Sequence, residues 1–282
     1  MTLNSFWAFF SVSSLVLPMV IISALSFPAL CPTNPGKVQE QAAAVRAEMP
    51  DFYFCQLIER DMTIKAIFFD VGDTLYHNPE FRDAQSKQPI KQLSEARGIT
   101  YEEAKALFKK TREELKNRLP YVTKVAVMGE LGISRLEMHR YMARLNPKEF
   151  LQPDKRLGEI LKRLGRRYEL GIITNVLEEL LDKVLDALGI DKSVFRYVVS
   201  VDNTKNSKPH EEPFLKALEL AGVKAEECIY VGDSLGKDIA PAKRIGMKTI
   251  WISGGQELPE DVSVDASISS IYEVEDAVSR IK

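Results

Sequence analysis

Short apolar runs alternate with amphipathic segments through the second half of the chain. The runs predict strands, and the segments between them carry apolar residues at helical spacing. Three of these segments are followed by a glycine where helices commonly end, at Gly189, Gly222 and Gly246. Such alternation predicts a parallel sheet covered by helices on both faces. The predicted strands are 168–174, 196–201, 228–232, 248–253 and 266–271, and the predicted helices are 177–188, 212–221, 237–245 and 274–281.

One further strand is predicted far upstream. Residues 64–69 form an apolar run rich in Ile and Phe, which suits a buried strand of a parallel sheet. The pattern then becomes helical, and capping boxes begin at Thr100 and Ser134. Helices are predicted at 89–96, 100–118, 123–131 and 134–145, and a fifth, at 154–164, is assigned to the sheet-bearing unit. The sequence therefore predicts an α/β fold, a Rossmann-like parallel sheet core with an inserted all-helical domain.

The predicted domain boundaries follow from this pattern. The core comprises residues 62–77 and 153–282, and the helical insert comprises residues 78–152. Residues 37–61 form a polar linker, and residues 1–36 are a hydrophobic segment without a charged side chain.

The hydrophobic segment has two interpretations. Residues 5–31 are long enough to anchor the protein in a membrane, although they lack the basic start of a signal peptide. Alternatively, a cytoplasmic protein begins near Met62, and residues 1–61 are an upstream extension that the mature protein lacks. The mass of the protein purified from its source would distinguish the two.

Composition excludes several classes of protein. The formal net charge of −2 over 282 residues gives no basic excess for binding nucleic acid. The three cysteines form no Cys-x-x-Cys pair, and the three histidines are scattered, so neither a zinc site nor a disulfide framework is indicated. We expect a monomer or a homodimer that acts on a small molecule.

Polar residues follow the predicted strands at one edge of the sheet. Because the carboxyl ends of parallel strands meet at one edge, we expect these residues to converge. They are Asp70, Gly72, Asp73 and Thr74 after the first strand, Thr174 and Asn175 after the second, Lys208 after the third, and Asp233, Ser234 and Asp238 after the fourth. Several of them have an ordinary local alternative: Thr174 and Asn175 as helix caps, Lys208 as a solvated lysine, Asp233 as a strand-end turn residue, and Asp238 as a first-turn carboxylate.

Together these residue types suit a phosphoryl group and a divalent cation. Mg²⁺ prefers oxygen ligands, which Asp70, Asp233 and the carbonyl of Gly72 could provide. Lys208 and Thr174 could hold phosphoryl oxygens, and Asp70 could attack phosphorus to form an aspartyl phosphate.

The four motifs, in this order and with a helical insert after the first, resemble those of the haloacid dehalogenase-like hydrolase superfamily. The resemblance covers about residues 65–281. It implies Mg²⁺ dependence, an Asp70 nucleophile, a metal site that includes Asp233 and Asp238, and a helical cap that chooses the substrate. It also implies that the segment of Thr174 and Asn175, together with Lys208, binds the phosphoryl group.

One position departs from the family pattern. Phosphatases of this superfamily usually carry a second aspartate two residues after the nucleophile, as general acid and base, and that position is Gly72 here. Asp73, a residue such as His77, or water could substitute. Residues that could face the cleft by position alone are Tyr76, His77, Arg82, Tyr121 and Lys124.

Three functions remain open at this point. The first is a Mg²⁺-dependent phosphatase of small phosphorylated metabolites. The second is a 2-haloacid dehalogenase, which also lacks the second acid but needs no metal, so the Asp233 motif argues against it. The third is a non-catalytic protein that binds a phosphorylated ligand.

Overall fold

The computed structural model describes residues 64–119 and 122–281. The predicted hydrophobic segment (1–36), the linker (37–61) and Tyr121 lie outside these residues. Among the helices that are described, none has both the length and the apolar character that crossing a bilayer requires.

A six-stranded parallel sheet forms the centre of the described chain, as the sequence predicted. Its strand order is β3-β2-β1-β4-β5-β6, so β1 lies between β2 and β4. Phe69, the last residue of β1, pairs with Ile172 on one side and Val231 on the other. The strands are β1 (Ala66–Phe69), β2 (Glu169–Ile173), β3 (Tyr197–Val199), β4 (Cys228–Gly232), β5 (Lys248–Ile252) and β6 (Ala266–Ile268).

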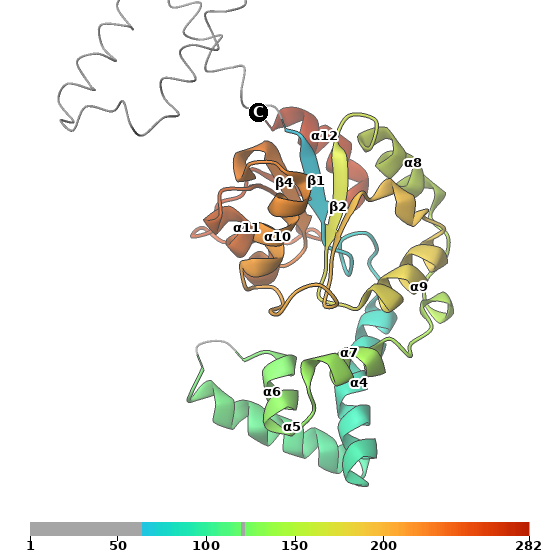
Figure 1. The fold of residues 1–282 in the computed structure, drawn as a ribbon, viewed down its shortest axis with the longest axis vertical. Helices are drawn as coiled ribbons and strands as arrows, with labels where there is room; N and C mark the ends of the chain where they lie inside the picture. Colours follow the sequence, from blue (N-terminus) through green and yellow to red (C-terminus); the bar gives the residue numbers. More distant parts are fainter. Residues whose placement is uncertain (1–63, 120–121, 282) are drawn as a thin grey trace, which may run out of the picture. The chain divides into compact units, whose positions relative to one another are not determined.

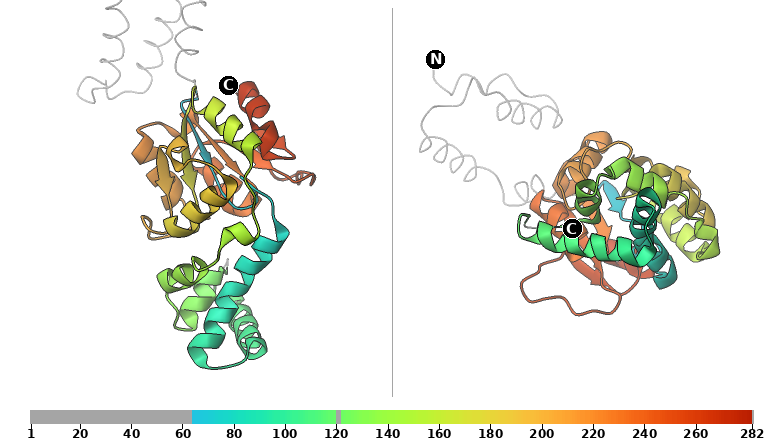
Figure 2. Two further views of the ribbon diagram at one scale, coloured as in Figure 1. Left: turned by 90° about the vertical axis from the view of Figure 1, so that its right-hand side faces the viewer. Right: turned by 90° about the horizontal axis from the view of Figure 1, so that it is seen from below.

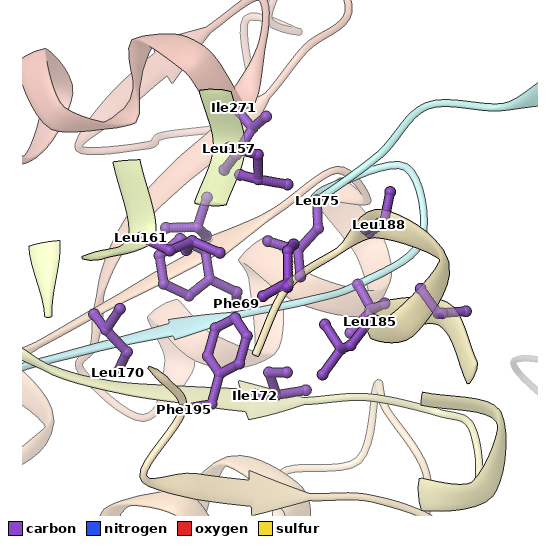
Figure 3. Close-up of a cluster of buried hydrophobic side chains, with 14 of the residues drawn as sticks. Phe69, Leu75, Leu157, Leu161, Leu170, Ile172, Leu185, Leu188, Phe195 and Ile271 are labelled. Atoms are coloured by element: carbon purple, nitrogen blue, oxygen red, sulfur yellow. The ribbon is translucent and has the colours of Figure 1, made fainter. Parts of the chain in front are cut away.

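Strand β1 is wholly buried because helices cover both faces of the sheet. Alternate residues belong to different hydrophobic clusters: Phe69 packs with residues of α8, α9 and α12, whereas Phe68 packs with residues of α10 and α11. Figure 3 shows part of the first cluster, with Phe69 among the leucines of α8 and α9. The helices are α8 (Lys155–Leu164), α9 (Glu178–Leu188), α10 (Glu212–Ala221), α11 (Ala240–Arg244) and α12 (Val274–Arg280).

The chain between β1 and α8 is helical and has its own hydrophobic cluster. Leu93, Ala104 and Met128 are among its fully buried members. In Figures 1 and 2 these helices lie beyond the carboxyl end of β1, and α4 connects them to the sheet. They are α4 (Pro79–Arg97), α5 (Tyr101–Lys116), α6 (Lys124–Glu130) and α7 (Arg135–Met142). Both predicted capping boxes are present, at the starts of α5 and α7.

Two predicted helices were wrong in extent. The helix predicted at 89–96 begins at Pro79 and continues through Pro89. The Asn78 side chain caps it by accepting a hydrogen bond from Phe81 N, and Pro79 suits the first helical position.

The helix predicted at 237–245 is replaced by a π-helical turn, Leu235–Ile239, followed by the short helix α11. This turn carries Asp238 toward the site described next.

Candidate active site

Asp70 stands where β1 leaves the sheet. Its main-chain N–H donates to Val231 O at 2.9 Å, which extends the pairing of β1 with β4 by one residue. The chain then turns sharply, with Leu75 N donating to Val71 O, and Asp73 adopts a left-handed φ of 56°. The Asp70 side chain is 14% exposed, so its carboxylate lies at a solvent-reachable edge of an otherwise buried strand.

The Lys208 ammonium is buried and uses all three of its hydrogens on neighbouring side chains. It donates to Asp70 Oδ1 at 2.8 Å, Asp238 Oδ1 at 2.6 Å and Tyr230 Oη at 2.7 Å. Lys208 is therefore not the solvated loop lysine of the local alternative, because its side chain is only 3% exposed. Its position joins the ends of β1 and β4.

Asn175 holds the main chain of Lys208 in place. The Asn175 side chain accepts from Lys208 N at 2.8 Å and donates to Lys208 O at 2.9 Å. Both groups of the amide are thus engaged, which makes Asn175 a positioning residue; the phosphate contact predicted for it stays a prediction. The neighbouring Thr174 is buried and borders the cavity described below.

Asp238 completes the buried network around Lys208. Its Oδ1 also accepts from Tyr230 Oη at 3.0 Å, and its Oδ2 accepts from Ser234 N at 3.1 Å. This close packing needs a glycine at 232, because a Cβ there would lie 2.6 Å from Asp238 Cβ. The carboxylate is thus committed to three donors inside the protein.

Three carboxylates converge at this point. Asp70, Asp233 and Asp238 each offer an oxygen, and these atoms lie within 4.8 Å of one another. The loop that carries Asp233 is held by Trp251, whose Nε1 donates to Asp233 O at 2.8 Å. A set of carboxylate oxygens this close suits a hard divalent cation.

The pKa shifts within the cluster also favour a bound cation. Burial raises the pKa of Asp70 to about 6, with Lys208 opposing and Asp238 adding to the rise. Burial also raises the pKa of Asp233 to about 7, and the charges of Asp70 and Asp238 add to it. For Lys208, burial favours the neutral amine, but Asp238 and Asp70 outweigh it and raise the pKa. Three acids beside one ammonium leave negative charge that a bound cation would offset.

An open cavity of about 1180 Å³ borders this cluster. The core contributes Asp70, Thr174, Lys208 and Asp233 to its walls, and the helical insert contributes residues that include Arg112, Lys124 and His139. The insert is also tied to the core: the Arg135 guanidinium, at the start of α7, donates to Thr204 O at 2.9 Å and to Ser207 Oγ at 3.1 Å.

The two remaining candidates from the first motif have different surroundings. Gly72 borders the cavity. Asp73 also borders it, but its carboxylate is paired with the helical insert and the turn: Oδ2 lies 3.1 Å from Arg82 Nη1, and Oδ1 lies 2.9 Å from His77 Nδ1. Asp73 is therefore a less available proton donor than its position in sequence suggested.

Sequence reasoning missed Tyr230 and Trp251. Both lie in strands, where an aromatic residue is usually interpreted as part of the hydrophobic core. The hydrogen-bond partners of their polar atoms are fixed only by tertiary packing. A tyrosine within an otherwise apolar buried strand was the available signal for the first, because a buried hydroxyl needs a partner.

Comparison with known proteins agrees with this geometry. The family model for haloacid dehalogenase-like hydrolases matches residues 67–252. A glyceraldehyde 3-phosphate phosphatase of Methanocaldococcus jannaschii is 32% identical over 235 residues, which cover 78% of this chain and 99% of that protein. A phosphoglycolate phosphatase of Aquifex aeolicus is 35% identical over 105 residues, 37% of this chain and 48% of that protein.

Solved structures show the same fold. The crystal structure of a phosphatase of this family from Thermococcus onnurineus superimposes with a TM-score of 0.55 at 25% identity and covers 76% of this chain and 97% of its own. With a partly buried aspartate at the end of the first strand, a family match over most of the described chain and relatives that are named as phosphatases, this chain belongs to the haloacid dehalogenase-like hydrolase family.

Proposed function

We propose that this protein hydrolyses small phosphate monoesters through an aspartyl-phosphate intermediate on Asp70, with a divalent cation, Mg²⁺, bound among the carboxylates. The observation that carries the proposal is the convergence of Asp70, Asp233 and Asp238 with the buried ammonium of Lys208. A metal-free binding protein would gain nothing from three acids held within 4.8 Å of one another.

Each residue has a role in the proposed reaction. An Asp70 oxygen attacks phosphorus, the bond from phosphorus to the bridging ester oxygen breaks, and water later hydrolyses the acyl phosphate. Lys208 orients the Asp70 carboxylate and, with Thr174, stabilises charge on the phosphoryl oxygens. Asp70, Asp233 and the carbonyl of Gly72 would hold Mg²⁺, which offsets repulsion between carboxylate and phosphate. Asp238 serves Lys208 first, because its oxygens already accept from Lys208, Tyr230 and Ser234 N.

The helical insert supplies the substrate side of the cavity in this proposal. We propose the boundaries 62–77 and 153–282 for the core and 78–152 for the cap. The relative with the longest match described above is named for glyceraldehyde 3-phosphate, so a small phosphorylated metabolite of that size is the first candidate substrate.

The test compares two variants of the full chain with the wild type. Asp70→Asn removes the nucleophile and should abolish turnover of p-nitrophenyl phosphate and of glyceraldehyde 3-phosphate. Asp261→Asn, at an exposed carboxylate, is the matched control and should leave turnover unchanged. Turnover by the wild type should require Mg²⁺ and stop with EDTA. Undiminished turnover by Asp70→Asn would refute the nucleophile assignment.

One specific observation favours a second candidate function. Gly72 leaves the family's second acid absent, as in 2-haloacid dehalogenases. Halide release from a 2-haloacid in the presence of EDTA, without phosphatase activity, would favour that reaction. Stabilisation by phosphorylated ligands without any turnover would instead indicate a binding protein.

A further inference from the structure

The space left by the missing second aspartate is not empty. A Cβ built on Gly72 would have Tyr76 Oη as its nearest neighbour, at 3.7 Å. The main chains of Gly72 and Tyr76 also form an isolated β-bridge, so the two residues are held side by side. The Tyr76 hydroxyl therefore lies beside the place from which an aspartate at position 72 would reach into the cavity.

Aromatic packing holds the ring of Tyr76 in place. Its ring lies 5.8 Å from that of Phe81 in α4, and Phe81 stacks on Phe150 at 5.2 Å. Both Asp70 and Tyr76 border the same cavity.

The competing residue is engaged elsewhere. One oxygen of the Asp73 carboxylate accepts a hydrogen bond from Arg82, and the backbone of Asp73 holds a left-handed φ of 56°. Turning that carboxylate toward the phosphoryl site would break its contact with Arg82. Tyr76 carries no charge and borders the cavity together with Gln85, whose side chain interacts with the Tyr76 hydroxyl.

We propose that the Tyr76 hydroxyl donates a hydrogen bond to the bridging oxygen of the phosphate ester and so replaces the second aspartate of related phosphatases. This inference rests on the proposed function. As Asp70 forms its bond to phosphorus, the bond to the bridging oxygen breaks and its electron pair stays on that oxygen. The Tyr76 O–H stabilises the charge that develops there, and a water molecule supplies the proton that completes the alcohol.

Leaving-group dependence tests this role. Tyr76→Phe removes the donor and keeps the ring. With p-nitrophenyl phosphate, whose leaving group needs little help, kcat/KM should change by less than about threefold. With glyceraldehyde 3-phosphate, an ester of a poor leaving group, kcat/KM should fall about tenfold to a hundredfold. Tyr272→Phe, at an exposed tyrosine outside the cavity, is the control and should change neither.

A second variant tests whether an aspartate at position 72 can replace the hydroxyl of Tyr76. Gly72→Asp combined with Tyr76→Phe places a carboxyl group where the hydroxyl was, and a Cβ at 72 meets no atom closer than 3.7 Å. This double variant should recover most of the activity on glyceraldehyde 3-phosphate that Tyr76→Phe loses. Melting temperatures of both variants, measured beside the wild type, show whether each one folds.

The outcomes separate this inference from the proposed function. An equal loss on both substrates, with a lowered melting temperature, would give Tyr76 a packing role and overturn the inference while phosphatase activity stands. An unchanged rate on both would overturn it as well. A wild type without turnover on either ester would instead refute the proposed function.

Discussion

Replacing Asp233 by Asn should stabilise the metal-free protein at alkaline pH. Asp233 is one of three carboxylates whose oxygens lie within 4.8 Å of one another, and its own side chain is partly buried. Asn has nearly the same shape and no charge, so the variant removes repulsion from Asp70 and Asp238 without opening a cavity. The Trp251 contact is kept, because it uses the main-chain oxygen of residue 233.

The size of the effect follows from the pKa of Asp233. A rise from 3.8 to about 7 corresponds to an upper limit of about 4 kcal/mol. Because Asp233 keeps contact with solvent, we expect about 1–2 kcal/mol. For a folded unit of this size, that corresponds to a rise in melting temperature of about 3–6 °C.

The stabilisation expected from Asp233→Asn should also depend on pH. The folded-state pKa lies above the unfolded value, so ionisation of Asp233 is disfavoured in the fold. The contribution of Asp233 to the wild-type free energy of unfolding is therefore most favourable below about pH 4, and this contribution is lost as the pH rises through about 7. The advantage of Asp233→Asn should be largest at pH 8 and shrink toward pH 4.

Thermal unfolding of the full chain in EDTA, at pH 8 and at pH 5, measures this effect, and Asp261→Asn serves as control. Added Mg²⁺ should then stabilise the wild type, by about 2.7 kcal/mol at a hundredfold excess over Kd, and the variant much less. A variant that melts below the wild type at pH 8 in EDTA, or one that gains as much from Mg²⁺, would refute the reasoning.

The other predictions concern two lysines at the cavity. Lys208→Met should destabilise the protein by about 3–5 kcal/mol in urea unfolding at pH 8, because it leaves Asp70 and Asp238 facing each other without the ammonium. The loss of stability should be smaller at pH 5. An equal loss at both pH values would contradict the electrostatic cause. Lys124 borders the cavity, where partial enclosure and the charges of Lys237 and Arg112 lower its pKa. Lys124→Gln should therefore raise KM about threefold to tenfold for 2-phosphoglycolate, which carries a second anionic group, and less for glyceraldehyde 3-phosphate; equal changes would show that this ammonium does not select charge.

Local patterns in the sequence predicted most of the elements. Helix α10 and strand β4 have the bounds that the pattern indicated, because apolar spacing defines both and Gly222 ends the helix in a left-handed conformation. Helix α4 shows the limit of this reasoning. Pro89 suggests a helix start in the sequence, whereas the helix begins earlier, at the Asn78 cap and Pro79, and continues through Pro89, which is buried in the insert.

The candidate site could be predicted as a set of residues but not as a set of contacts. Polar residues after parallel strands must meet at one edge, so the chain order alone brought Asp70, Lys208 and Asp233 together. Which partner each polar atom takes depends on residues far away in sequence: Lys208 bonds Asp70 across 138 positions. Asn175 holds the main chain of Lys208 for the same reason.

Tertiary structure also decided which group stands beside Gly72. In the sequence, Asp73 is the nearer acid, and a strand-to-helix turn gives no sign of where its carboxylate points. Arg82 binds one oxygen of that carboxylate, and packing of the Tyr76 ring against Phe81 accompanies the approach of the Tyr76 hydroxyl to Gly72. Periodicity determines which residues are buried and which strand ends align, because it is a property of neighbours along the chain. The pairing of charges and hydroxyls is settled only when distant segments compete for the same space.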